Sequence, residues 1–132
     1  MRISRKAGYG LLALTYLARK GEGHICYRNE IACRFHISRA VLAKILQSLR
    51  RSGILRSHLG SHGGYSLARN PAKISLAEVL EALGADVQMP RQRSTRHSEP
   101  SLAARVATGL QRVGKDVQRL FSRVSLKDLA GD

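Results

Sequence analysis

Residues 28–53 have the sequence RNEIACRFHISRAVLAKILQSLRRSG, and this stretch decides the fold. It predicts one helix from about Arg28 to Phe35 and a second that starts after Ser38, whose hydroxyl can cap it, and stops before Gly53. Apolar residues recur along the second helix at spacings of three and four, on one stripe: Val41, Leu42, Ile45, Leu46 and Leu49. The opposite face carries Ala40, Lys44, Gln47 and Arg51. A helix with such a polar face can enter a groove of another molecule.

Two short strands are predicted directly after these helices. Ile54–His58 and Tyr65–Ala68 flank the segment LGSHGG at 59–64, whose three glycines permit a tight hairpin tip. Two helices joined by a short turn, with Ala32 at the closely packed position, followed by a two-stranded wing, form the pattern of a winged helix-turn-helix domain. In that arrangement the second helix lies in the major groove of DNA.

Further helices complete the same unit. Ser4 can cap a helix that ends near Gly21, and a short extended piece follows at His24–Tyr27. Ser75 and Glu78 have the spacing of a capping box, in which the Glu side chain reaches back to the amide of the cap residue. The predicted fold is mainly α with a small β wing (α+β).

The chain after this unit divides into a linker and a long helix. We expect a winged helix-turn-helix domain over 1–84, a polar linker or loop over 85–101, and a dimerisation helix with a C-terminal turn over 102–132. One apolar stripe runs along the long helix: Leu102, Val106, Leu110, Val113, Val117, Leu120 and Val124. Ser125 and Asp128 form a second capping-box pattern, which predicts a last short helical turn.

The charge balance points to a polyanionic partner. Lys and Arg number 23 against 9 Asp and Glu in 132 residues, a formal net charge of +14, and no acidic residue occurs between Glu30 and Glu78. Aromatic residues are only 5% of the chain and Trp is absent, which argues against an aromatic platform for single-stranded nucleic acid. We find no Ser-His-Asp, paired-carboxylate or phosphate-loop arrangement, so an enzyme is not expected.

The predicted DNA-binding residues lie on the second helix of the motif and on the wing. Arg39 could pair with guanine through a bidentate contact, whereas Ala40 offers only a methyl contact. Arg50 and Arg56 are better placed for phosphates, which position the protein without specifying sequence. The full predicted set is Ser38, Arg39, Ala40, Lys44, Gln47, Arg50, Arg51, Arg56, His58, Ser61, His62 and Gly63.

Several ordered motifs resemble the bacterial Rrf2 family of winged-helix regulators. They are Met1-Arg2-Ile3-Ser4 with Tyr9, Glu30-Ile31-Ala32, Ile37-Ser38, Leu42-x-x-Ile45-Leu46-x-x-Leu49-x-x-x-Gly53, Gly60-x-x-Gly63-Gly64-Tyr65-x-Leu67-Ala68, Ile74-Ser75-Leu76-x-Glu78-Val79 and Val124-Ser125-Leu126-x-Asp128-Leu129. The resemblance covers nearly the whole chain. It implies a homodimeric transcription regulator, usually a repressor, whose long C-terminal helix crosses to the partner. The wing departs from the family at Leu59, where an Arg often stands, and His58 or His62 could partly replace it.

A second departure concerns cofactors. Cluster-binding members of the family carry three cysteines between the wing domain and the long helix, and Asp86–Gly109 contains none, so we predict no iron-sulfur cluster and no other cofactor. His24, Cys26, Cys33 and His36 could offer four metal ligands, but they fall on separate elements, and we predict no metal site. Cys26 and Cys33 remain candidates for thiol redox sensing, which is an alternative mode of regulation.

These observations together predict a cytoplasmic, homodimeric repressor that binds a palindromic operator in double-stranded DNA. Two cysteines cannot form a disulfide framework, and the opening apolar run is too short to span a bilayer. A nonspecific nucleic-acid-coating protein would need the same charge and much the same fold, so it stays the second functional alternative. The sequence leaves open whether a partner protein or a small-molecule effector controls the regulator.

Overall fold

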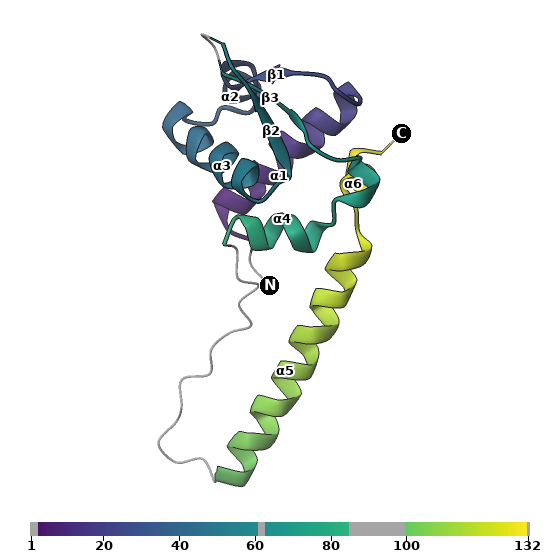
Figure 1. The fold of residues 1–132 in the computed structure, drawn as a ribbon. Helices are drawn as coiled ribbons and strands as arrows, with labels where there is room; N and C mark the ends of the chain where they lie inside the picture. Colours follow the sequence, from purple (N-terminus) through teal and green to yellow (C-terminus); the bar gives the residue numbers. More distant parts are fainter. Residues whose placement is uncertain (1–2, 61–62, 85–99, 132) are drawn as a thin grey trace.

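The computed structural model describes residues 3–60, 63–84 and 100–131. Helices dominate it, and one small antiparallel sheet joins them (Figure 1). The order along the chain is α1 (Arg5–Lys20), β1 (Cys26–Tyr27), α2 (Arg28–Phe35), α3 (Arg39–Arg51), β2 (Leu55–His58), β3 (Gly64–Leu67), the short 3₁₀ turn η1 (Pro71–Lys73), α4 (Leu76–Ala82), α5 (Pro100–Arg123) and α6 (Leu126–Ala130). The predicted fold class, mainly α with a β wing, is confirmed.

Side-chain caps set the helix boundaries, as the sequence predicts. Ser4 Oγ accepts a hydrogen bond from the Ala7 amide at the start of α1 (3.2 Å). Both predicted capping boxes form, at the starts of α4 and α6. The helix-turn-helix bend passes through His36, which has a φ of 53° and is the one described residue other than glycine in the left-handed region.

The sheet has one strand more than the predicted two-stranded wing. Its strand order is β1-β3-β2, because the extended piece before α2 pairs with β3 through Cys26↔Tyr65 and Tyr27↔Gly64. Gly64 permits this close approach, since a Cβ placed there would lie 2.8 Å from Cγ2 of Ile25. The sequence predicts an extended piece at His24–Tyr27, but a strand of two residues has too little periodicity to predict that it pairs with β3.

The core lies between α1, α3 and α4, closed by α2 and the sheet. Leu42, Ile45, Leu46 and Leu49 of α3 are fully buried, as predicted. Val41 differs from the prediction: its side chain is 42% exposed and lies at the edge of the apolar stripe. At about 100° per residue, Val41 lies about 40° outside the sector that the four buried residues occupy.

The C-terminal turn packs into the helix-turn-helix domain. Leu126 of α6 is fully buried in its core, and α6 lies against α1. Two backbone hydrogen bonds join the start of α6 to the start of α4. The Leu126 amide donates to the Ile74 carbonyl (2.9 Å), and the Leu76 amide donates to the Val124 carbonyl (2.7 Å). In its packing, α6 therefore belongs with the domain of residues 1–84, whereas the sequence analysis groups it with the long helix over 102–132.

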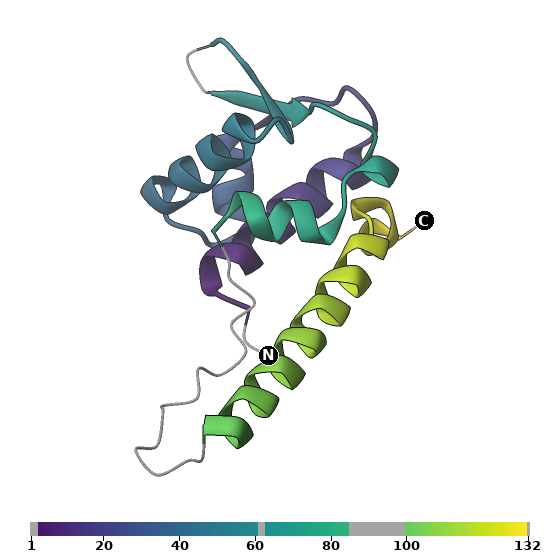
Figure 2. The ribbon, with the colours of Figure 1, turned by 60° about the horizontal axis from the view of Figure 1, so that its bottom comes forward.

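The long helix α5 projects from this domain as a single rod, in both views (Figure 2). It contacts α4, and Phe121 near its C-terminal end packs against the core. Residues 85–99, which include most of the predicted linker, lie outside the described residues. None of the helices in the described ranges is long and apolar enough to cross a membrane.

Candidate nucleic-acid interface

The exposed face of α3 gathers most of the predicted DNA-binding residues. Ala40, Lys44, Gln47 and Arg51 are all exposed and fall within a sector of about 60° on the helix. Arg39 and Arg50 are exposed on one flank of that sector. At the start of the helix, Ser38 Oγ accepts from the Val41 amide (3.4 Å), so the Ser38 hydroxyl serves as the cap. The three buried leucines and the buried isoleucine of α3 fix this orientation, because they hold the opposite face in the core.

Val41 is an interface candidate that the sequence pattern assigns to the core. It is exposed on the flank opposite Arg39 and Arg50, one turn before Lys44. A branched apolar side chain in that place can make contact with the methyl group of thymine in a major groove. A β-branched residue at the edge of an apolar stripe was the only sequence signal for it.

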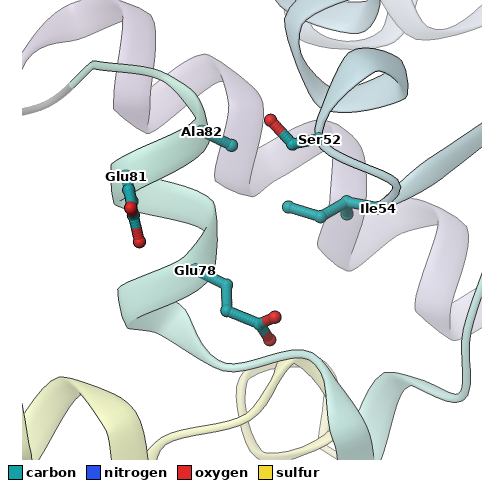
Figure 3. A pocket seen from close by; sticks show the side chains of 5 residues that line it. All are labelled: Ser52, Ile54, Glu78, Glu81 and Ala82. Carbon is teal, nitrogen blue, oxygen red and sulfur yellow. The ribbon is translucent and has the colours of Figure 1, made fainter.

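The cations on the exposed face of α3 form no ion pair with a carboxylate of the described residues. Among the described residues, the two ion pairs are Arg69–Glu78 and Asp116–Arg119, and neither involves α3. Two carboxylates of the domain lie on α4, where Glu78 and Glu81 line a pocket of about 430 Å³ together with Ile54 (Figure 3). The α3 cations are therefore free to meet phosphate.

The wing adds an exposed cation, Arg56, whereas the predicted residue His58 is hydrogen-bonded within the sheet. Arg56 is exposed on β2, directly opposite Ser66 of β3. His58, by contrast, is half-buried, and a 2.7 Å hydrogen bond joins its Nε2 to Ser66 Oγ. In this structure His58 is thus engaged with the neighbouring strand. Leu59 is fully exposed at the tip.

The remaining tip residues are partly outside the described chain. Ser61 and His62 lie outside the described residues. Gly63 is described, and it has a φ of 59°, the left-handed conformation that the glycine-rich hairpin predicts. Its carbonyl accepts a hydrogen bond from the Arg28 amide at the start of α2 (3.0 Å), which ties the wing to the helix-turn-helix.

Arg28 is a further candidate that the sequence pattern did not single out. Its Nε is buried and has no hydrogen-bond partner within the described structure. An unsatisfied buried guanidinium nitrogen costs free energy. The place of Arg28, beside the base of the wing, fits a phosphate contact.

The two cysteines lie in different environments. Cys26 is fully buried on β1, and burial together with the nearby Glu30 raises the pKa of its thiol to about 11. Cys33 is exposed on α2, and both thiols are free. A thiol with such a high pKa is almost entirely protonated at neutral pH and reacts slowly, which disfavours the Cys26/Cys33 redox pair. Over residues 3–60, 63–84 and 100–131, no group of three or more His, Cys, Asp or Glu side chains is placed to hold a metal ion.

Comparisons with known proteins agree with this geometry. The family model Rrf2, described as an iron-dependent transcriptional regulator, matches residues 3–132. An HTH-type transcriptional regulator of Synechocystis sp. is 33% identical over 132 residues, covering 100% of this chain and 89% of that protein. A crystal structure of Staphylococcus aureus CymR in its oxidised form has a TM-score of 0.77 at 26% identity, and the match covers 100% of this chain and 98% of that one.

A third match is more local. An HTH-type transcriptional regulator of Mycobacterium tuberculosis is 39% identical over 83 residues, which are 63% of this chain and 52% of that protein. In that comparison the chain spans about half the length of its relative.

Proposed function

The chain belongs to the Rrf2 family of DNA-binding transcriptional regulators, and from that premise we propose that it recognises one specific sequence of double-stranded DNA. In this proposal α3 enters the major groove, while the wing and the start of α2 hold the flanking phosphates. The observation that carries it is the exposed polar strip of α3, whose cations have no carboxylate partner in the described structure. That surface has the charge for affinity and the mixed side chains for base recognition.

Individual roles follow from position along the strip. Lys44 and Gln47 in the strip carry donors that reach base edges, and Arg39 does so from the first turn of α3, whereas Ala40 and Val41 supply apolar contacts to thymine. Arg50, Arg56 and Arg28 are assigned to phosphates, because they flank the strip or stand on the neighbouring elements.

We further propose that two copies act together. Leu102, Val113 and Leu120 of α5 are 56%, 45% and 59% exposed, and the apolar stripe they belong to spans only about 80° of the helix. An uncovered apolar seam of this length is stabilised by pairing with the same seam of a second copy. Two-fold symmetry then implies a palindromic operator with half-sites one or more helical turns apart. The family resemblance implies that the dimer is a repressor.

The family description names iron, and the residues of this chain do not fit an iron-sulfur cluster. A cluster needs several thiolates at one place. This chain has two cysteines, of which Cys26 is buried in the core and Cys33 is exposed on another element. We therefore propose a regulator that works without a cluster.

A binding selection from genomic DNA fragments tests the function. Full-length protein purified without oxygen should enrich one palindromic motif, and its affinity for that motif should exceed that for scrambled DNA by about a thousandfold or more at physiological salt. Enrichment of no motif, with equal and steeply salt-dependent binding to all fragments, would instead indicate a nonspecific coating protein. Iron content and the visible spectrum of the same preparation test the cluster-free assignment.

A further inference from the structure

A pocket of about 470 Å³ lies on the side of the domain formed by α1, the end of α2 and α6. Its residues come from three elements that are far apart in the sequence, and none belongs to the DNA-binding set above. Roughly 300–1,000 Å³ is the usual size of a site for a small organic molecule. The pocket therefore has the volume of a ligand site rather than of a packing defect.

Among the lining residues that the structure describes, three are cations and none carries a carboxylate. The cations are Arg19, Lys20 and Arg34. Lys20 Nζ lies 5.2 Å from the centroid of the Tyr16 ring, and Arg34 Cζ lies 5.3 Å from the same centroid. Two cations held on one ring repel each other, and an anion placed between them removes that repulsion.

Arg19 is already oriented for such an anion. Its Nε donates a 2.7 Å hydrogen bond to the Ala130 carbonyl at the end of α6. That contact fixes the guanidinium and uses only one of its five N–H groups. A carboxylate or phosphate could then accept from the remaining N–H groups without a large loss of side-chain entropy.

Besides the three cations, Thr15 and Tyr16, the lining consists of the apolar residues Leu12, Phe35 and Leu129. Leu12 and Leu129 are 46% and 42% exposed, although each faces a concave surface. Phe35 packs edge-on against Tyr16, with ring centroids 5.6 Å apart. A hydrophobic group in the pocket would cover both leucines and contact the aromatic pair.

We propose that this pocket binds a small amphipathic organic anion, with its charged group between Arg19, Lys20 and Arg34 and its apolar body against Leu12, Phe35 and Leu129. Inorganic anions would leave the leucines uncovered, and neutral apolar molecules would leave the cations unpaired. Both requirements together select the amphipathic class.

The pocket is lined by elements that connect directly to the proposed DNA-binding face, so binding there could influence that face. Arg34 and Phe35 are the last residues of α2, directly before the His36 turn into α3. Leu129 lies on α6, which is joined to the end of α5. Occupancy should therefore change DNA affinity, a consequence that rests on the proposed function.

The binding test needs no DNA. Full-length protein with labelled tyrosine rings is titrated with phenylacetate, hexanoate and phenyl phosphate while the Tyr16 ring signals are followed. At least one anion should give a saturable shift, and its uncharged counterpart, such as phenylacetamide for phenylacetate, should bind at least tenfold more weakly. Lys20→Gln and Arg34→Gln should each weaken binding about tenfold. Arg5→Gln removes an exposed charge at the other end of α1 and should change nothing.

Three results would overturn the proposal: no saturable shift with any of the three anions, equal binding of the uncharged counterpart, or an Arg5→Gln effect as large as that of Arg34→Gln. DNA affinity is then measured with and without the bound anion. An unchanged affinity would refute the coupling while leaving the binding site intact. Failure to bind any DNA specifically would refute the proposed function, and the titration of the Tyr16 ring signals would still show whether the pocket binds the anion.

Discussion

Lys44 and Arg50 are both exposed on α3, yet they are assigned opposite tasks, because Lys44 lies in the middle of the exposed strip and Arg50 on its flank. A side chain that reaches base edges contributes to sequence discrimination. One that reaches phosphate contributes affinity to every sequence alike. The two positions therefore offer a direct test of how α3 sits in the groove.

We expect Lys44→Ala to weaken operator binding by about 1–3 kcal/mol and to change the base preference at one operator position. Arg50→Ala should weaken all sequences equally and reduce the slope of log K against log salt by about 1. Lys127→Ala is the matched control, because Lys127 is exposed on α6, away from α3 (Figure 1). Quantitative binding to single-base operator variants at several salt concentrations measures all three. An unchanged base preference in Lys44→Ala would remove Lys44 from the reading face.

The two thiols make a second prediction at the residue scale. Under native conditions an alkylating reagent should modify Cys33 rapidly and leave Cys26 unmodified, since Cys26 is buried and its thiol has a pKa of about 11. Mass spectrometry of peptides after timed alkylation measures both rates, and denatured protein supplies the control in which both react. Equal native rates would restore the Cys26/Cys33 redox alternative.

At the scale of the elements, the start of α4 is the best-defined local structure. Glu78 accepts hydrogen bonds from the Ser75 amide (3.0 Å) and from Arg69 Nη2 (3.1 Å), while Ser75 Oγ accepts from the Glu78 amide (3.2 Å). The hydrogen bond from the Ser75 amide is the main reason that the pKa of Glu78 lies below its ordinary value of 4.5, and Arg69 adds to it. These bonds stabilise the folded state as long as the carboxylate is ionised.

Glu78→Gln should lower the free energy of unfolding by roughly 0.5–1 kcal/mol at neutral pH, the usual contribution of a helix cap. Because the pKa is depressed in the folded state, the contribution is present above pH 4.5 and is lost as pH falls through the lower folded-state pKa. The difference between wild type and variant should therefore shrink in acid. Urea unfolding at constant protein concentration, at neutral pH and below pH 4.5, measures it. A difference that stays constant with pH would show that the ionised carboxylate is not the stabilising group.

At the scale of the whole molecule, part of the apolar stripe of α5 stays exposed within the described residues, at Leu102, Val113 and Leu120. The helix projects from the domain, and its C-terminal end is anchored because α6 is built into the core (Figure 2). Such an anchor fixes the direction in which the seam points. Two domains joined through their α5 helices would thus present their α3 helices at a defined spacing.

Val113→Glu combined with Leu120→Glu should convert the proposed dimer into a monomer and weaken operator binding by at least a hundredfold, because two half-sites would then bind independently. Gln111→Glu is the control, since Gln111 is exposed on the opposite face of α5 and the substitution adds one carboxylate away from the apolar stripe. Sedimentation velocity gives the mass, and circular dichroism checks that the domain is still folded. A wild-type chain that sediments as a monomer would refute the proposed dimer.

The sequence by itself determined the local structure of this protein. Helix starts at Ser4, Ser38, Ser75 and Ser125 were predictable because each cap is a hydrogen bond between residues three apart. The exposed strip of α3 was predictable for a similar reason, since helical periodicity alone separates Lys44 and Gln47 from the buried stripe.

Only the tertiary structure decided which distant elements meet. It paired β1 with β3, exposed Val41, joined His58 to Ser66 by a hydrogen bond and packed α6 against α1. It also brought Arg19 and Arg34 together with Leu129 around one pocket. These contacts join residues far apart in the chain, and their free energy depends on packing and solvent exclusion in three dimensions, which no local pattern of residues encodes.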